Sequence, residues 1–402
     1  MSDSAPAAIS AAGVIGVGIV GLGAAGRAFV PALREHAGFR PVAIADRAPE
    51  VRSELRAELG VAAYDSLAAM LSDPGVDAVY VATPTDLHRE HATQAFAAGK
   101  HVLVEKPMAA RLEDARAMIA AAERAGKVLL VGHSHSYDLP IWRMRELIAG
   151  GSLGRVRMVH TWCYTDWVYR PRRSEELDRG KGGGVTFRQG SHQFDIIRLL
   201  CGGVAKSVRA RTFDWDPQRR TIGAHVVYLD FADAAATAVY NGYGHFATME
   251  LGFDVSEWGF LQPPETRRPV RAPSAASGTS DEVRAKAERA KRAIPAGAPY
   301  QPFFGLTLVS CERGDIRQSP RGLYVYTHEG RAEIDLPSDQ SPRDLVVAEF
   351  YDALTGNAPA VHDGRWGLAN LEICTAAIAS AESGREIVLH EQVALPAART
   401  GQ

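Results

Sequence analysis

The feature that most constrains this chain is a glycine-rich segment between a short apolar run and a helical pattern. Residues 14–20 read VIGVGIV, which is typical of a strand buried on both faces of a parallel sheet. The run continues into GLGAAG, residues 21–26, and Asp46 stands twenty positions after the last glycine, where a second apolar run ends. This order predicts a Rossmann βαβ unit that binds a dinucleotide.

Each residue of the glycine segment has an expected task at such a cofactor. Gly21 permits the tight turn, Gly23 lets the backbone approach the pyrophosphate, and Gly26 lets the helix pack closely on the strand. Ala24 and Ala25 open the helix whose N-terminus would face the phosphate charge. We therefore expect these five residues in the cofactor site.

The residues that end the second strand bear on the choice of cofactor. The carboxylate of Asp46 would accept hydrogen bonds from the adenosine ribose and repel a 2′-phosphate, which favours NAD. A guanidinium at Arg47 could pair with that phosphate, so NADP stays an alternative.

Strand and helix patterns alternate until about residue 131, and the rhythm then changes. At 402 residues the chain is too long for one core, so two domains are expected. Residues 1–135 predict an α/β domain, a Rossmann doubly wound parallel sheet. Residues 136–402 predict an α+β domain for substrate binding and oligomerisation, with an open, mainly antiparallel sheet. Within it, residues 262–300 predict an exposed insertion that contains a charged helix.

The bulk composition excludes several classes of protein. A net charge of -2 gives no basic field, so nucleic acid is not an expected partner. No apolar run reaches the roughly 18 residues of a membrane span, so no membrane partner is expected. The four cysteines lie far apart, which favours reduced thiols and a cytoplasmic location.

Three further motifs point to one family. They read ATPTDLH at residues 82–88, EKP at 105–107, and GVTFRQGSHQFD at 184–195. Together they are similar to the Gfo/Idh/MocA family of oxidoreductases, and the resemblance covers nearly the whole chain. It implies an NAD(P)-dependent enzyme that acts on CH–OH or CH–CH donors, works as a homodimer or homotetramer, and takes a small molecule as substrate.

The resemblance also assigns residues to the reaction centre. Carboxyl ends of parallel strands form the crevice in which ligands bind, and Lys106 follows such a strand, so we expect it to exchange the substrate's hydroxyl proton. His192 would hold a hydroxyl or act as base. A solvated surface lysine and a satisfied core histidine are the alternatives. The further expected cofactor contacts are Thr83, Pro84, His88 and Glu105.

A cluster of arginines and aromatic residues predicts an anionic, flat substrate. Arg188 stands where the family usually has an aspartate, four residues before the histidine. Tyr164, Arg170 and Arg172 follow a predicted strand, and guanidinium groups recognise carboxylates while aromatic faces suit a ring. A solvated basic loop is the alternative for Arg172 and Arg173.

Within the family, the chain is most similar to the branch that acts on cis-dihydrodiols of the phthalate type. The resemblance implies oxidation of a carboxylated cyclic cis-dihydrodiol to the catechol, a step of aromatic catabolism. A sugar or cyclitol dehydrogenase is the first alternative. A dinucleotide-binding regulatory protein without catalysis is the second.

Two histidine pairs have a spacing that could suit a metal ion. His133 and His135 are expected to alternate along a strand, and no third ligand follows at convincing spacing, so we expect no metal and a substrate contact from His135. His88 and His91 are better explained by a helix surface and a cofactor contact.

Overall fold

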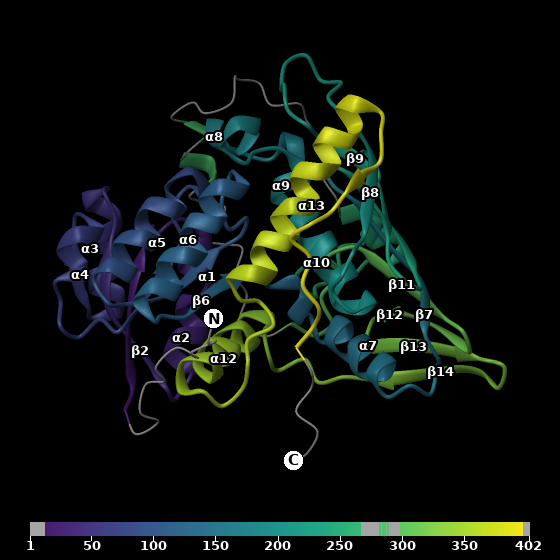
Figure 1. Ribbon diagram of the computed structural model, residues 1–402, viewed down its shortest axis with the longest axis horizontal. Coiled ribbons are helices and arrows are strands. Elements are labelled where there is room, and N and C mark those ends of the chain that lie inside the picture. Colours follow the sequence, from purple (N-terminus) through teal and green to yellow (C-terminus); the bar gives the residue numbers. More distant parts are fainter. Residues whose placement is uncertain (1–12, 267–280, 283, 287, 289–297, 397–402) are drawn as a thin grey trace. The chain divides into compact units, whose positions relative to one another are not determined.

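The computed structural model describes residues 13–266, 281–282, 284–286, 288 and 298–396 of the chain (Figure 1). By their internal contacts the residues fall into two compact units. Unit 1 comprises Met1–His133, Arg343–Leu368 and Pro396–Gln402, and unit 2 comprises Ser134–Pro342 and Ala369–Leu395. The functional division after residue 135 stays a prediction.

Unit 1 contains the predicted Rossmann sheet. Within residues 13–133 six parallel strands lie in the order β3-β2-β1-β4-β5-β6. The chain runs outward from β1 to β3 and then crosses to β4, so the carboxyl ends of β1 and β4 lie side by side where the strand order reverses. This is the edge at which such sheets bind ligands. The strands are β1 (Ile15–Val20), β2 (Phe39–Ala45), β3 (Ala62–Tyr64), β4 (Ala78–Val81), β5 (His101–Glu105) and β6 (Leu129–Gly132).

Helices join these strands as the alternating pattern predicts, with one interruption. The helix expected up to residue 36 is divided at Phe29, because Pro31 has no backbone N–H to donate. Figure 1 shows α5 and α6 side by side in this unit. The helices are α1 (Ala24–Ala28), α2 (Val30–Glu35), α3 (Pro49–Leu59), α4 (Leu67–Leu71), η1 (Thr85–Leu87), α5 (His88–Ala97) and α6 (Leu112–Ala125).

A late segment of the chain completes unit 1. Phe350, on α12 (Pro342–Thr355), stacks on Phe39 of β2 at 5.7 Å between ring centroids. The backbone N–H of Val131 donates to the carbonyl of His362 at 2.8 Å. This return to unit 1 could not be predicted from the sequence, because nonlocal packing leaves no periodic pattern in a single segment.

Unit 2 contains the predicted open sheet. In its described part nine strands form one sheet, in the order β14-β13-β12-β11-β7-β10-β9-β8-β15, and of these pairs β7 and β10 alone run parallel. The expectation of a mainly antiparallel sheet is confirmed. The strands are β7 (Val156–Tyr164), β8 (Ser207–Phe213), β9 (Ala224–Asp230), β10 (Ala235–Asn241), β11 (Leu306–Cys311), β12 (Gly314–Ser319), β13 (Gly322–Thr327), β14 (Gly330–Asp335) and β15 (Ile387–Val388).

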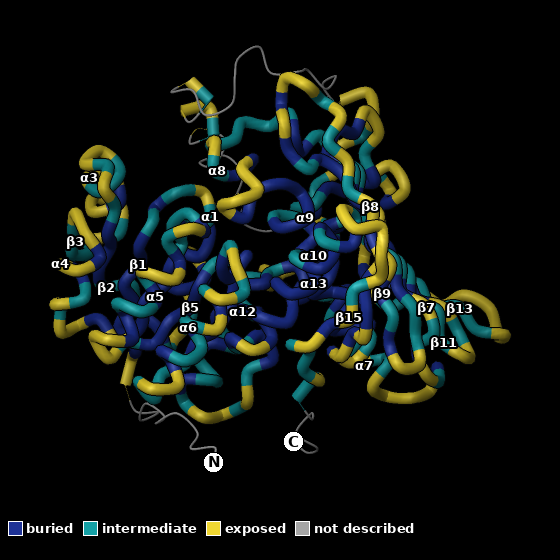
Figure 2. Tube along the Cα trace, turned by 45° about the horizontal axis from the view of Figure 1, so that its top comes forward, coloured by how far each residue is buried: buried dark blue, intermediate teal, exposed yellow. Residues whose placement is uncertain are grey.

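One buried helix covers the inner face of this sheet and positions the motif around His192. Every residue from Gly190 to Leu200 of α10 is buried, as Figure 2 shows by its dark blue trace. The amide of Gln193 donates to the carbonyls of Thr161 and Val239, which fixes the helix on β7 and β10. The other helices are η2 (His135–Tyr137), α7 (Leu139–Ala149), η3 (Trp167–Tyr169), α8 (Ser174–Leu177), η4 (Arg179–Lys181), α9 (Val185–Arg188), α10 (Gly190–Cys201), η5 (Thr248–Leu251), η6 (Pro264–Thr266) and α13 (Gly364–Ser383).

The segment 262–300 departs in part from its predicted exposure. Its described residues between 281 and 288 are helical, as expected, but the side chains of Glu282 and Lys286 are only 11% and 23% exposed. Both form ion pairs with other residues of unit 2, so the predicted exposure is wrong for these two. Residues 267–280 and 289–297 lie outside the described residues. Among the helices described, none is long and apolar enough to cross a membrane.

Candidate active site

The glycine turn of unit 1 has no room for side chains. Gly21 has φ +87°, and a Cβ there would lie 2.7 Å from the backbone of Ala82, at the end of β4. A Cβ on Gly26 would lie 2.0 Å from the Gly21 carbonyl oxygen. Gly23 precedes Ala24 and Ala25, the first residues of α1. The turn therefore leaves the backbone bare at the strand reversal, which fits the approach of a pyrophosphate.

Asp46 is held beside this turn. Its Oδ2 accepts a hydrogen bond from the N–H of Leu22 at 2.8 Å, and its Oδ1 accepts one from Ala48 at 3.0 Å. Arg52 donates to the carbonyls of Asp46 and Arg47, and the Arg47 side chain is exposed. A fixed carboxylate next to a bare glycine turn fits the adenosine ribose of NAD.

Tyr80 joins two predicted cofactor elements and was missed by the sequence reasoning. Its hydroxyl donates to Glu105 Oε1 at 2.6 Å and lies 3.3 Å from the carbonyl of Ala25. Burial, together with the Glu105 carboxylate, raises the pKa of Tyr80 well above its ordinary value, so the hydroxyl keeps its proton. Glu105 therefore positions Tyr80, and its predicted cofactor contact stays a prediction.

His88 is a correction to the predicted site. Its ring is buried, with Nε2 2.8 Å from the Thr83 carbonyl and Nδ1 3.1 Å from the Pro107 carbonyl. Both nitrogens thus face backbone oxygens and the ring is buried, so the predicted surface position is wrong, while the predicted cofactor contact stays a prediction. His88 instead ties the loop after β4, with Thr83 and Pro84, to the half-buried Lys106 and its cis peptide with Pro107. His91 adds a hydrogen bond of 2.9 Å to the Thr83 hydroxyl.

In unit 2, His192 lies in an aromatic and imidazole cluster. The His192 ring stands edge-on to His135, with ring centroids 4.5 Å apart, and also contacts Phe304 at 4.9 Å. The His135 ring stacks on Phe304 at 4.3 Å. The structure thus brings together two histidines that the sequence predicted separately, and adds Phe304, from a segment without a recognisable motif.

His135 carries a positive charge that two carboxylates hold. Its Nδ1 donates to Asp138 Oδ2 at 3.1 Å, and its Nε2 lies 3.6 Å from Glu257 Oε1. Burial alone would lower the pKa of His135, but Asp138 and Glu257 outweigh it and raise that pKa to about 9. Glu257 also lies 4.0 Å from Arg170, which pairs with Asp166 at 2.6 Å. His135 is therefore an imidazolium at neutral pH.

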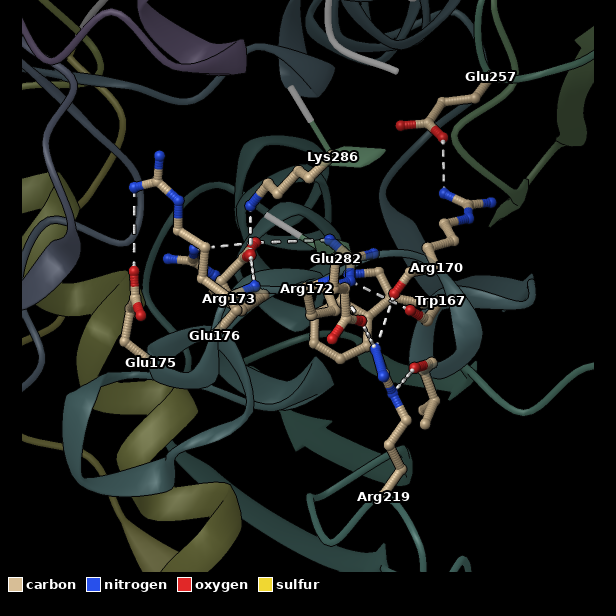
Figure 3. A network of polar contacts seen from close by, with 12 residues as sticks. Trp167, Arg170, Arg172, Arg173, Glu175, Glu176, Arg219, Glu257, Glu282 and Lys286 are labelled. Carbon is tan, nitrogen blue, oxygen red and sulfur yellow. Dashed lines mark hydrogen bonds and ion pairs between the residues drawn. The ribbon is translucent and has the colours of Figure 1, made fainter. Parts of the chain in front are cut away.

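Arg172 and Arg188 meet at a buried carboxylate, Glu176. Their Nη atoms lie 3.5 Å and 3.4 Å from Glu176 Oε1, and Lys286 pairs with its other oxygen (Figure 3). The Arg172 guanidinium lies 4.1 Å above the ring of Trp167. The bland alternative of a solvated loop is therefore wrong for Arg172, whereas Arg173 is half exposed beside Glu175.

The structure also places Tyr164 and the pair of His133 and His135. Tyr164 ends β7, where its ring contacts Phe246 at 5.6 Å. His133 and His135 do not alternate along a strand, because β6 ends at Gly132 and His135 begins η2. Among the described residues, no group of three or more His, Cys, Asp or Glu could hold a metal ion.

Some of the missed residues had a weak signal. Asp138 stands three positions after His135, a spacing at which side chains meet on a helical turn. Glu176 lies four positions after Arg172, which is the same kind of signal. Glu257, Phe304 and Lys286 come from distant segments, and only the tertiary structure reveals them.

The fold and the glycine turn define a class: a nicotinamide-dependent oxidoreductase with an N-terminal Rossmann domain. Residues 15–133 match the oxidoreductase family model with an NAD-binding Rossmann fold, and residues 141–255 match the GFO/IDH/MocA C-terminal domain. The chain belongs to the Gfo/Idh/MocA family of oxidoreductases, and its N-terminal domain is an NAD-binding domain.

Known relatives agree with this assignment. The chain is 39% identical over 350 residues to 1-carboxy-3-chloro-3,4-dihydroxycyclohexa-1,5-diene dehydrogenase of Comamonas testosteroni, covering 83% of this chain and 87% of that protein. It is similar to a putative dehydrogenase structure from Bordetella bronchiseptica RB50, with TM-score 0.83, 38% identity, and coverage of 93% and 99%. The WlbA dehydrogenase of Bordetella pertussis, solved with NADH and UDP-GlcNAcA, shares the fold at TM-score 0.68 and 23% identity, with coverage of 94% and 99%.

Proposed function

We propose that this enzyme oxidises a carboxylated cyclic cis-dihydrodiol to the corresponding catechol with NAD. The substrate we favour is of the phthalate 4,5-cis-dihydrodiol type, because the sequence motifs resemble those of the family branch that acts on such diols. The name of the Comamonas testosteroni relative also describes a ring with a carboxylate and two hydroxyls.

One observation carries the proposal: two guanidinium groups converge where the family usually has an acid. Arg188 replaces the aspartate that would bind a sugar hydroxyl, and it lies with Arg172 around Glu176. Guanidinium groups bind carboxylates bidentately, whereas a neutral polyol gains little from them. The buried indole of Trp167 lies against the Arg172 guanidinium and holds that charge in place. A sugar or cyclitol dehydrogenase therefore fits less well.

The chemistry follows from the predicted reaction centre. Bound NAD supplies the hydride acceptor. The family resemblance implies that Lys106 accepts the proton of the reacting hydroxyl and that His192 aids proton transfer, and we adopt these two roles in the proposal. The imidazolium of His135 next to His192 stabilises negative charge that develops on the oxygen. The hydroxydienone that results tautomerises to the catechol, and aromatisation makes the oxidation strongly favourable.

A substrate panel tests the proposal. The enzyme is supplied with NAD or NADP and with a dihydrodiol diacid, inositol or glucose, and the reduced nicotinamide band is followed. We expect turnover of the diacid with NAD. Preferred turnover of inositol or glucose would establish the alternative class, and no turnover of any compound with either cofactor would favour the regulatory protein.

The carboxylate role of Arg188 has its own test. Arg188→Ala is expected to raise KM for the diacid by about 10- to 100-fold, as loss of a charged hydrogen bond does. Arg209→Ala, at an exposed arginine of β8, is the matched control and leaves KM unchanged. Equal kinetics of the Arg188 variant and wild type would reject the role.

We also propose that the enzyme works as a homodimer or homotetramer. The outward face of β7 and β9 carries four large apolar side chains that are 40–46% exposed: Met158, Trp162, Val226 and Tyr228. An antiparallel sheet with a solvated face normally alternates apolar and polar residues, so an apolar outward face favours burial against another subunit.

A further inference from the structure

A buried charge cluster in unit 2 draws one residue from the segment 262–300. The carboxylate of Glu176 is 6% exposed and pairs with Arg172, Arg188 and Lys286. Figure 3 shows Lys286 and Arg172 pointing toward Glu176 from different segments. Three cations thus share one buried carboxylate within a single cluster.

Hydrogen bonds to the backbone hold the charged groups of the cluster in position. Glu176 accepts a hydrogen bond from the N–H of Arg173 at 2.8 Å, and its own carbonyl accepts one from Gly184, the residue before α9 and Arg188. The Arg172 Nε donates to the carbonyl of Trp167 at 3.2 Å, on whose ring the guanidinium lies. Cations fixed in this way lose little freedom when they bind an anion.

The position of Lys286 in the cluster is supported by the contacts of a neighbouring residue, Glu282. Glu282 accepts a hydrogen bond from the N–H of Arg172 at 2.8 Å and pairs with the buried Arg219. Glu282 and Lys286 stand four residues apart, so they share one face of a helical turn. The ion pair of Glu282 with Arg219 therefore positions this helical turn, and the Lys286 ammonium pairs with Glu176.

The electrostatics of the cluster favour an added anion. Burial lowers the pKa of Lys286 to about 8. The Glu176 carboxylate raises this pKa, whereas repulsion from Arg172 and Arg188 lowers it further. Burial alone would raise the pKa of Glu176, but the three cations hold it well below its usual range. A further negative charge nearby would stabilise the protonated form of this buried ammonium.

We propose that Lys286 is a specificity-determining residue that, with Arg172 and Arg188, makes this site accept a ring with two neighbouring carboxylates in preference to one. The inference rests on the proposed function and deepens it. A guanidinium fork matches one carboxylate bidentately, and an ammonium acts as a compact point charge for the second. Lys286, whose neighbour Glu282 pairs with Arg219, is then part of substrate recognition.

The experiment compares phthalate with benzoate, an aromatic diacid and monoacid that cannot react. Their binding to the NAD-saturated enzyme is measured by calorimetry for wild type, Lys286→Met, Lys286→Arg and the control Lys206→Met, at an exposed lysine. We expect Lys286→Met to weaken the binding of phthalate by about 10- to 100-fold and the binding of benzoate by less than about threefold. Lys286→Arg restores most of the phthalate affinity, and the control matches wild type.

Kinetics of the diacid and monoacid diols separate this inference from the proposed function. In support, Lys286→Met raises KM for the diacid diol and leaves kcat within about twofold. If Lys286→Met lowers the melting temperature but leaves the preference for phthalate over benzoate unchanged, the ion pair is structural and the inference is overturned. The inference is also overturned if the wild-type enzyme binds no phthalate. Phthalate binding that depends on Lys286 without diol turnover supports the site but refutes the proposed function. Diol turnover that does not depend on Lys286 supports the proposed function but refutes the role of Lys286.

Discussion

The charge on His135 predicts a pH dependence of stability. Its pKa is about 9 in the fold and about 6.5 in the unfolded chain, because Asp138 and Glu257 hold the imidazolium. A group whose pKa rises on folding contributes stability that is fully present below the unfolded pKa and is lost as the pH rises through the folded pKa. The free energy of unfolding of unit 2 should therefore fall by about 3 kcal/mol between about pH 6.5 and about pH 9, owing to this group.

The assay is chemical unfolding at a series of pH values for wild type and His135→Gln. The difference between the two proteins isolates His135 from other titrating groups, and its pH dependence carries the result even if the variant is less stable throughout. His328→Gln, at an exposed histidine in the turn between β13 and β14, is the matched control. A wild-type curve parallel to the His135→Gln curve over this window would refute the reasoning, and so would an NMR titration that placed the pKa of His135 near 6.5.

Four further predictions address the cofactor site and the assembly. Gly26→Ala places a Cβ 2.0 Å from a carbonyl oxygen and should weaken NAD binding by at least about tenfold in a binding titration. Gly13→Ala is the control and should leave NAD binding unchanged, because there is open space around Gly13. Asp46→Ser should shift the ratio of kcat/KM from NAD toward NADP by about tenfold, because ribose hydrogen bonds are lost. His88→Ala should cost about 1–3 kcal/mol in chemical unfolding and lower kcat, because a buried backbone carbonyl loses its hydrogen-bond donor and the loops around Thr83 and Pro107 lose their link. Trp162→Glu should yield monomers by light scattering, and an unchanged mass would contradict the proposed interface.

The N-terminal fold was predictable because its signals are local. A buried strand, a glycine turn and an acidic residue at a fixed spacing each follow from one short stretch of sequence. The turn packs as expected, with Gly21 against Ala82. The division of the first helix near Pro31 follows from a missing donor and could have been anticipated.

The site was predictable in its residue types and less so in its partners. The sequence singled out His135, His192, Arg172 and Arg188, but it gave no reason to expect that two carboxylates make His135 cationic. The burial of His88 was missed because a histidine at the start of a helix has the same pattern whether its ring faces solvent or backbone carbonyls. Lys286 was placed in an exposed insertion, since a charged helix looks solvated until its ion pairs are seen.

One measurement tests the central claim most directly: rapid mixing of the enzyme and NAD with a cis-dihydrodiol that carries two ring carboxylates. Growth of the reduced nicotinamide band, together with an equal amount of catechol diacid, is the result that we predict. If neither NAD nor NADP is reduced while the same preparation reduces NAD with inositol or glucose, the proposed substrate class is wrong.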